Sequence, residues 1–530
     1  MIWFNRLIFI YLYCYQRVFM AKRVPIFKPY FQDQIMAIPP SLDELVSKSH
    51  PVRIVNDVIN RINIQGLLDA YKIKGSSSYH PQMLLKVLVF GYVSNIYSSR
   101  KLEMACRENV NFMWLSGMSF PDHNTINRFR GVRLKEALRS IFEGVVKLLA
   151  DEGLLSIDDV YVDGTKIEAN ANKYTFVWKK SIHTNKEKMK KALAEIWDYA
   201  QSVAKREDDL PDPPDLTDIN KENVQATVDK LNAVLADNKD VSKKMRSKLQ
   251  YVTKNYPTKI EEYEQQEAIL GERNSYSKTD TQATFMRMKE DPMLNGQLKP
   301  GYNIQISTSN QYIVNYTVHS NPTDTRTLSL HLDQHKQSYG KHPEAVTADA
   351  GYGSEENYDY LEAKDIKGYV KYNMFDKEQK NSNPIKVPFS VDNLYYNKDE
   401  DWYICPMGQR MTCLGTFKIK NASGFEQEVK KYQAKNCSNC PLNGACHKGA
   451  GNRIIQVNEN LNRHKDRAYE LLNSEEGIIK RKKRCYDVEP VFGNIKQNHN
   501  FRRFMLRGKD LVSIEWGLLA IAQNIRKKAA

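Results

Sequence analysis

The sequence KRKKRCYDVEPVFGNIKQNHNFRRFMLRG, from Lys480 to Gly508, places one glutamate inside the most basic surroundings of the chain. An unbroken run of cations, Lys480–Arg484, precedes Glu489. Further cations follow it at Lys496, Arg502, Arg503 and Arg507. On a regular α-helix, Glu489 and Lys496 lie two turns apart on the same side. That side suits a metal ion at one end and a phosphate at the other. The plainer alternative is a solvated basic helix with one ordinary ion pair.

The composition favours a multidomain protein with a polyanionic partner. The chain has 530 residues, of which 41% are hydrophobic and 27% charged, enough to bury a sizeable core. Lys plus Arg exceed Asp plus Glu by 78 to 63, a net charge of +15. Such a surplus indicates nucleic acid first, because phosphate neutralisation releases counterions. Solubility alone would not explain why the cations crowd near Glu489.

The first residues resemble a targeting segment, but we expect none. The apolar run Leu7–Cys14 is too short to span a bilayer, and no small-residue cleavage site follows it. A sensible start recurs at Met20, so residues 1–19 are interpreted as an upstream translation-start artefact. No other stretch approaches a membrane span, and eight cysteines are too few for a disulfide-built fold, so we expect a cytoplasmic protein with no membrane partner.

Residues 41–153 have a helical pattern. Pro51 and Pro81 each open a segment with apolar residues at helical spacing. Asp122 is a predicted N-cap for a short polar, basic helix that presents Asn124, Asn127, Arg128 and Arg130. This pattern is consistent with DNA docking through a helix-turn-helix-like element, although many helical domains share it.

Strand patterns begin near Ser156 and resume after a helical interruption. A strand containing Val160 and Val162 is predicted to end on Asp163-Gly164, with Thr165–Ala169 returning as its hairpin partner. An aspartate there presents a carboxylate beyond the sheet edge, or is an ordinary turn residue. Residues 179–278 are predicted to form a helical insertion, with helices over Glu222–Ala236 and Val241–Tyr256.

A second acidic position follows a buried strand. Strands are predicted over Tyr302–Thr308 and Tyr312–Val318, and Ala345–Ala348 forms a short strand that ends at Asp349. A helix over Glu355–Ala363 and another strand follow. This order predicts an α/β unit with its functional end at the carboxyl edge of the strand.

Five cysteines lie in one short segment that also contains a predicted hairpin over Arg410–Lys418. The Cys-x2-Cys pair Cys437 and Cys440 has the spacing of a tetrahedral zinc site, which Cys405 and Cys446 would complete. Cys413 and His447 are possible substitutes, and free surface thiols are the alternative. Four thiolates would make a closed, structural site.

Asp163, Asp349 and Glu489 are the residues that we expect to converge. Three carboxylates suit two Mg²⁺ or Mn²⁺ ions, and a metal pair stabilises the attacking and leaving oxygens of an in-line phosphoryl transfer. The surrounding cations would then hold a DNA backbone.

Between about Pro39 and Ile525 the chain resembles bacterial insertion-sequence transposases of the DDE superfamily. The resemblance is carried by DHNTINRFRG, VYVDGTKIEANA, GYNIQIS with the later Asp324, VTADAGYGSEENY, the cysteine segment and VEPVFGNIK. It implies an α/β ribonuclease-H-like mixed sheet with flanking helices. It also implies an N-terminal all-α domain, a helical insertion and a small zinc-ribbon-like insertion.

The resemblance assigns roles to individual residues. Asp163, Asp349 and Glu489 would be the catalytic triad, and Lys496 would contact transposon-end DNA. A related Tyr-x2-Arg-x3-Glu-x6-Lys signature is incomplete, because Lys482 and Cys485 stand at its tyrosine and arginine positions. The remaining expected DNA contacts are Arg481, Arg484, Arg502, Arg503, Arg128 and Arg130.

The resulting organisation has six parts: an extension (1–40), a helical DNA-binding domain (41–153), a catalytic domain (154–178 and 279–400), a helical insertion (179–278), a Cys-rich segment (401–455) and C-terminal catalytic helices (456–530). The implied partners are terminal inverted repeats and target DNA in the nucleoid, bound by a homodimer or larger assembly. Three alternatives stay open: a metal-dependent nuclease that cuts without joining, a catalytically silent DNA-binding protein, and a catalytic zinc site at the cysteines.

Overall fold

The computed structural model describes residues 41–71, 78–203, 219–235, 241–288, 296–379, 389–421 and 424–530. By compactness the chain divides into Met1–Val46 and Ser47–Ala530. The first unit has one described helix, α2 (Leu42–Leu45), and the extension expected over residues 1–40 lies outside the described residues. No helix within the described ranges combines the length and the apolar composition that crossing a membrane requires.

The second unit begins with a series of helices, as the sequence predicts. They are α3 (Pro51–Arg61), α4 (Gln65–Asp69), α5 (Pro81–Val93), α6 (Ser99–Glu108), α7 (Val110–Ser116), α8 (His123–Arg128), the π-helical turn η1 (Phe129–Arg133) and α9 (Leu134–Asp151). Pro51 and Pro81 stand in the first turn of α3 and α5, where a missing N–H costs nothing. Asp122 is the N-cap of α8, and its carboxylate accepts the N–H of Thr125 at 2.7 Å.

The last helix, α19 (Lys509–Ala529), joins this helical region to the sheet. It packs against α3, α5, α9 and strand β6, and Trp516 and Asn524 are fully buried within it. The Asn524 side chain accepts the N–H of Ile313 and donates to its carbonyl, at 2.7 and 2.8 Å. The helix therefore belongs to the core rather than lying amphipathically on a surface.

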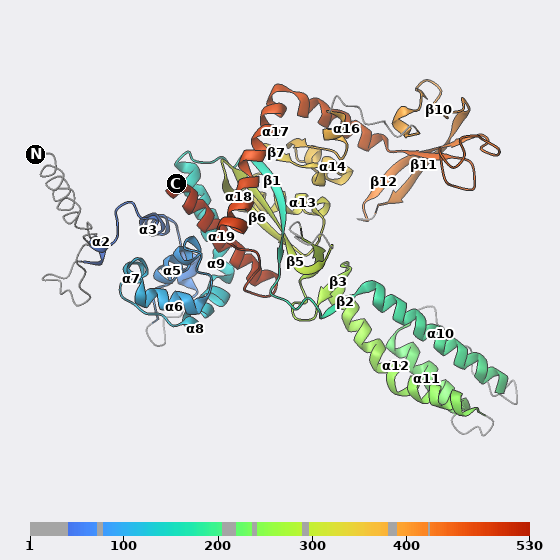
Figure 1. The fold of residues 1–530 in the computed structure, drawn as a ribbon, viewed down its shortest axis with the longest axis horizontal. Coiled ribbons are helices and arrows are strands. Elements are labelled where there is room, and N and C mark those ends of the chain that lie inside the picture. The colour runs from blue at the N-terminus through green and yellow to red at the C-terminus, as the bar shows by residue number, and fades with distance from the viewer. Residues whose placement is uncertain are drawn as a thin grey trace, which may run out of the picture. The chain divides into compact units, whose positions relative to one another are not determined.

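A six-stranded mixed sheet forms the centre of this unit (Figure 1). Its strands are β1 (Asp159–Glu168), β4 (Thr284–Arg287), β5 (Leu298–Ser309), β6 (Tyr312–His319), β7 (Ala345–Ala348) and β8 (Lys367–Val370). The order is β4-β5-β1-β7-β8, with β6 also paired to β5. Strand β1 runs antiparallel to β5 and parallel to β7, and β7 runs parallel to β8. The fold is therefore mixed α/β.

Helices and short turns flank the sheet. They are η3 (Asp324–Arg326), α13 (Leu328–Tyr339), η4 (Ala350–Tyr352), α14 (Glu355–Ala363), α15 (Phe375–Glu378), α16 (Glu459–Asn473), α17 (Glu475–Asp487), α18 (Glu489–Gly493) and the π-helical turn η6 (Asn494–Asn498). Helix α13 packs against β6, whereas α17 packs against β7 and β8.

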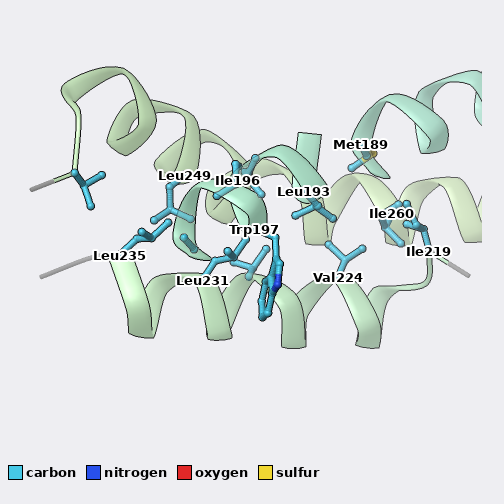
Figure 2. Close-up of a cluster of buried hydrophobic side chains, with 14 residues drawn as sticks. Met189, Leu193, Ile196, Trp197, Ile219, Val224, Leu231, Leu235, Leu249 and Ile260 are labelled. Atoms are coloured by element: carbon cyan, nitrogen blue, oxygen red, sulfur yellow. The ribbon is translucent and has the colours of Figure 1, made fainter. Parts of the chain in front are cut away.

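A three-helix arm interrupts the chain between the short strands β2 (Phe176–Trp178) and β3 (Ser275–Ser277), which pair antiparallel. Its helices are α10 (Lys179–Val203), α11 (Lys221–Leu235) and α12 (Lys243–Leu270). The arm has its own apolar core, which includes Leu193, Trp197 and Leu231 (Figure 2). Helix α12 continues well beyond the predicted end at Tyr256, because Ile260 and Leu270 still turn inward.

A second sheet contains the cysteine segment. It is antiparallel, with the order β13-β12-β11-β10-β9, and η5 (Val391–Asn393) precedes it. The strands are β9 (Tyr396–Asn397), β10 (Trp402–Ile404), β11 (Arg410–Lys420), β12 (Glu426–Ala434) and β13 (Ile454–Val457). The hairpin predicted within Arg410–Lys418 is wrong. Gly415, at φ 112°, makes a bulge in one long strand, and β11 pairs with β12 instead.

Candidate active site

A single guanidinium contacts all three predicted carboxylates. Arg484, on α17, places Nη2 3.2 Å from Asp163 Oδ1 and 3.6 Å from Asp349 Oδ2. Its Nη1 lies 3.3 Å from Glu489 Oε1. Residues from β1, from the end of β7 and from the start of α18 are thus brought together around one positive charge.

Asp163 does not lie at a strand end. It sits in the middle of β1, opposite Ile306 of β5, and is mostly buried. The predicted hairpin return over Thr165–Ala169 is wrong, because β1 continues through Gly164 to Glu168. Gly164 provides space rather than a turn, since a Cβ there would lie 2.8 Å from Asp324 Oδ1.

Asp349 lies where the sequence predicts it, immediately after strand β7. Its carboxylate accepts the N–H of Gly351 at 2.9 Å and caps the short turn η4. The side chain is 41% exposed, in contrast to 10% for Asp163. Asp349 is therefore more accessible to solvent than Asp163 in the group formed by Asp163, Asp349 and Glu489.

Glu489 opens α18, with only Val488 between it and the last residue of α17, and its side chain is half exposed. The expected alignment of Glu489 with Lys496 assumed a regular α-helix. The π-helical turn η6 (Asn494–Asn498) breaks this regularity, because its hydrogen bonds span five residues. Lys496 is 8% exposed, so most of its side chain lies inside the fold.

Polar side chains of β5 line the inner side of this acidic group. Gln305 and Asn303 lie on one face of β5, and their side-chain amides both donate to Asp324 Oδ1. The buried Tyr352 hydroxyl donates to Gln305 Oε1. Burial and the charges of Asp324, Asp163 and Asp349 hold the pKa of Tyr352 well above its usual value. These contacts join distant segments, so the sequence alone gave no signal for them beyond the resemblance that included Asp324.

Two stretches of the chain match known domain families. Residues 404–529 match the model of a transposase DDE domain, and residues 40–131 match that of a transposase domain. Both matches are to transposase families, and together they support an insertion-sequence DDE transposase. The DDE match includes Glu489, whereas Asp163 and Asp349 lie between the two matched stretches. No curated protein and no solved structure matches the transposase.

The basic run of the transposase docks α17 onto the sheet. Alternate residues of β1 share one face, and each meets a cation from α17. The pairs are Lys480 Nζ with Asp159 Oδ2 at 2.7 Å, Lys483 Nζ with the ring of Tyr161 at 5.6 Å, and Arg484 Nη2 with Asp163 Oδ1 at 3.2 Å. Part of the positive charge expected to face DNA is therefore used to position the helix that precedes Glu489.

The other predicted DNA contacts differ in accessibility. Arg128 is exposed on α8, and Arg502 is exposed with Nη2 2.8 Å from Gln497 Oε1. Arg503 is also exposed, but it donates to the carbonyls of Ala169 and Ala171. Arg481 is half-buried, with its guanidinium 5.0 Å from the centre of the Phe375 ring.

Arg130 was expected to contact DNA, but its side chain faces the interior of the helical region. It is 3% exposed, and its Nη1 donates to the Tyr97 carbonyl at 2.7 Å. Its Nη2 donates to Asn127 Oδ1 at 3.2 Å. Buried donors need such partners, so Arg130 holds helices together instead of presenting charge to DNA.

The four cysteines proposed as ligands line one small cavity of about 20 Å³, together with His447 and Arg453. Arg453 Nη1 donates to Cys446 Sγ at 2.9 Å, and the backbone N–H of Arg453 donates to Cys437 Sγ at 3.3 Å. Cys413 is exposed on β11 and is not among the cavity residues. Within the described ranges, no three of the thiol sulfurs lie within 4.8 Å of one another.

A second group with metal-binding side chains joins α14 to α16. The ligand atoms of Asp359, Glu362 and His464 all lie within 4.8 Å of one another. His464 Nε2 is 2.7 Å from Asp359 Oδ1, and Arg463 and Arg467 contact Glu362 at 2.8 and 2.7 Å. These ion pairs account for the group as a contact between two helices.

Proposed function

We propose that the transposase hydrolyses DNA at the ends of a mobile element and joins the freed 3′-hydroxyl to target DNA. The observation that carries this proposal is the contact of Asp163, Asp349 and Glu489 with one guanidinium. A place where three carboxylates surround a positive charge is also suited to divalent cations. The mixed sheet, with antiparallel and parallel partners on either side of β1, supports a ribonuclease-H-like catalytic domain.

The three acids would hold two Mg²⁺ or Mn²⁺ ions. Carboxylate oxygens are the hard ligands that these ions prefer, so the donor set fits. When bound, the ions supply charge stabilisation and an activated oxygen nucleophile. Asp163, fixed within a strand, would provide a rigid ligand, whereas Asp349 and Glu489 reach the site from its more exposed side.

Two assays test this function on the full-length protein with DNA that carries the flanking terminal repeats. The first measures nicking with Mg²⁺ or Mn²⁺, and the second measures joining of the nicked end to a target duplex. Joining is the expected result. Cutting without joining would indicate a nuclease of the same fold, whereas metal-independent binding with no nicking would indicate a silent DNA-binding protein.

The exposed cations near the site are proposed to bind the DNA backbone, and Arg502→Ala tests this. We expect weaker binding to all DNA sequences, with the slope of log Kd against log salt reduced by about one, because one phosphate contact is lost. The measurement is fluorescence anisotropy across a salt series. The control is Arg463→Ala, which removes an exposed arginine that Glu362 already pairs. An unchanged salt slope in Arg502→Ala would contradict the assignment.

We also propose that Cys405, Cys437, Cys440 and Cys446 hold a structural zinc ion. Four thiols that line one cavity are a suitable donor set for zinc, and N–H groups of Gln409 and Arg453 donate to three of the sulfurs and orient them. A closed set of four thiolates leaves no open position for chemistry, so the ion would stabilise the second sheet.

Removing the metal should unfold this sheet and leave the central sheet intact. Cys437→Ser is expected to lose bound zinc, measured by mass spectrometry, and amide protection in β10 to β13, measured by hydrogen exchange. Cys413→Ser, at an exposed cysteine outside the cavity, should behave like the parent protein. Equal zinc content in the two variants would contradict the ligand assignment. Loss of nicking on chelation without unfolding would instead make the zinc catalytic.

A further inference from the structure

Asp324, the first residue of η3, has a carboxylate that is fixed on one side only. Its Oδ1 accepts two amide N–H groups, from Asn303 Nδ2 at 2.7 Å and from Gln305 Nε2 at 2.9 Å. Both donors lie on β5 and are completely buried. Among the described residues, no side chain donates to Oδ2. The carboxylate is therefore oriented by one oxygen while the other is left for another partner.

The open oxygen lies beside the predicted catalytic acids. A Cβ added to Gly351 would be 3.0 Å from Asp349 Oδ1 and 3.8 Å from Asp324 Oδ2. A Cβ added to Gly164, the neighbour of Asp163, would be 2.8 Å from Asp324 Oδ1. Gly164 therefore leaves room for the Asp324 carboxylate, while Asp324 Oδ2 and Asp349 Oδ1 both lie within 3.8 Å of the position that a Cβ on Gly351 would occupy.

We propose that Asp324 is a fourth carboxylate of the divalent-metal site, with Oδ2 as its ligand atom. This inference rests on the proposed function, because it adds one ligand to the same site. A purely structural role is a weaker account of the geometry. Tying η3 to β5 needs only Oδ1, and it does not explain why the other oxygen lies beside Asp349. Four carboxylates would also balance the charge of two divalent ions.

Manganese binding to the full-length protein without DNA tests the inference, with free Mn²⁺ measured by electron paramagnetic resonance. Asp324→Asn keeps the side-chain size and an oxygen that can accept from Asn303 and Gln305. We expect this variant to bind Mn²⁺ at least about tenfold more weakly, because mutations of residues around a metal ion typically lower its affinity by that factor or more. Asp333→Asn, on α13 with its carboxylate against the Tyr360 hydroxyl, is the matched control and should bind as the parent does.

The outcomes separate this inference from the proposed function. Unchanged affinity in Asp324→Asn, with weakened affinity in Asp163→Asn, would overturn the role of Asp324 and leave the triad in place. Unchanged affinity in both variants would overturn the metal site itself. If Asp324→Asn melts early, Asp324→Glu serves instead, because it keeps the charge and moves the oxygen by one methylene. Parent-like Mn²⁺ affinity in folded Asp324→Glu would also count against direct ligation.

Discussion

Replacing Asp349 with asparagine is expected to lower strand cleavage by about a thousandfold, equivalent to about 4 kcal/mol of transition-state stabilisation. Asparagine keeps the size of the side chain and can still accept the N–H of Gly351, but it removes the negative charge that a divalent ion needs. Asp163→Asn and Glu489→Gln should have similar effects. Single-turnover cleavage of a labelled terminal-repeat duplex in Mg²⁺ gives the rate.

DNA affinity should not fall in these variants, because the acids do not bind the DNA backbone and neutralising one of them removes a repulsive charge. Asp365→Asn provides a control of the same chemical change. Asp365 is exposed and has φ 53°, a backbone conformation that asparagine tolerates well. Cleavage that persists at the parental rate in all three acid variants would exclude this catalytic assignment.

Arg484→Ala should destabilise the protein when divalent ions are absent. The Arg484 and Asp163 side chains are only 12% and 10% exposed. Removing one member of such a pair leaves a charge without its partner, and we expect a loss of about 3 kcal/mol in the free energy of unfolding. The measurement is chemical denaturation in the presence of a chelator.

Added Mg²⁺ should recover part of this loss, because the ion would supply positive charge to the same carboxylates. Lys482→Ala removes a cation from the exposed side of the same helix and should cost little in either condition. The double variant Asp163→Asn with Arg484→Ala should be less destabilised than the sum of the single variants. Additive losses and no response to Mg²⁺ would show that Arg484 does not share a site with metal.

Local patterns in the sequence placed two of the acids correctly. The buried run Ala345–Ala348 indicated a strand that ends at Asp349, and the spacing around Glu489 indicated a helix. Asp163-Gly164 was misinterpreted because an Asp-Gly pair commonly marks a turn. Here the strand continues, and the need for glycine comes from side chains on β5 and η3 that are distant in the sequence.

The roles of the cations were harder to predict from the sequence. A basic run has the same composition whether it faces DNA or pairs with a strand beneath it. Only the fold shows that Lys480 and Arg484 meet β1, and that the Arg130 guanidinium turns inward to the carbonyl of Tyr97. The π-helical turn that changes the position of Lys496 likewise has no sequence signal as clear as a capping residue or a proline.

The way the three-helix arm joins the chain also has a consequence for engineering. Trp178 and Ser275 are paired neighbours on β2 and β3, so the chain leaves and returns at one point, and the arm packs around apolar residues of its own. Chain ends that lie close together are one reason why domain insertion is tolerated. A DNA-binding domain of chosen specificity can therefore be inserted here in place of α10 to α12. The pairing of β1 with β5 and β7 would stay as it is, and the inserted domain would direct the proposed activity to its own DNA site.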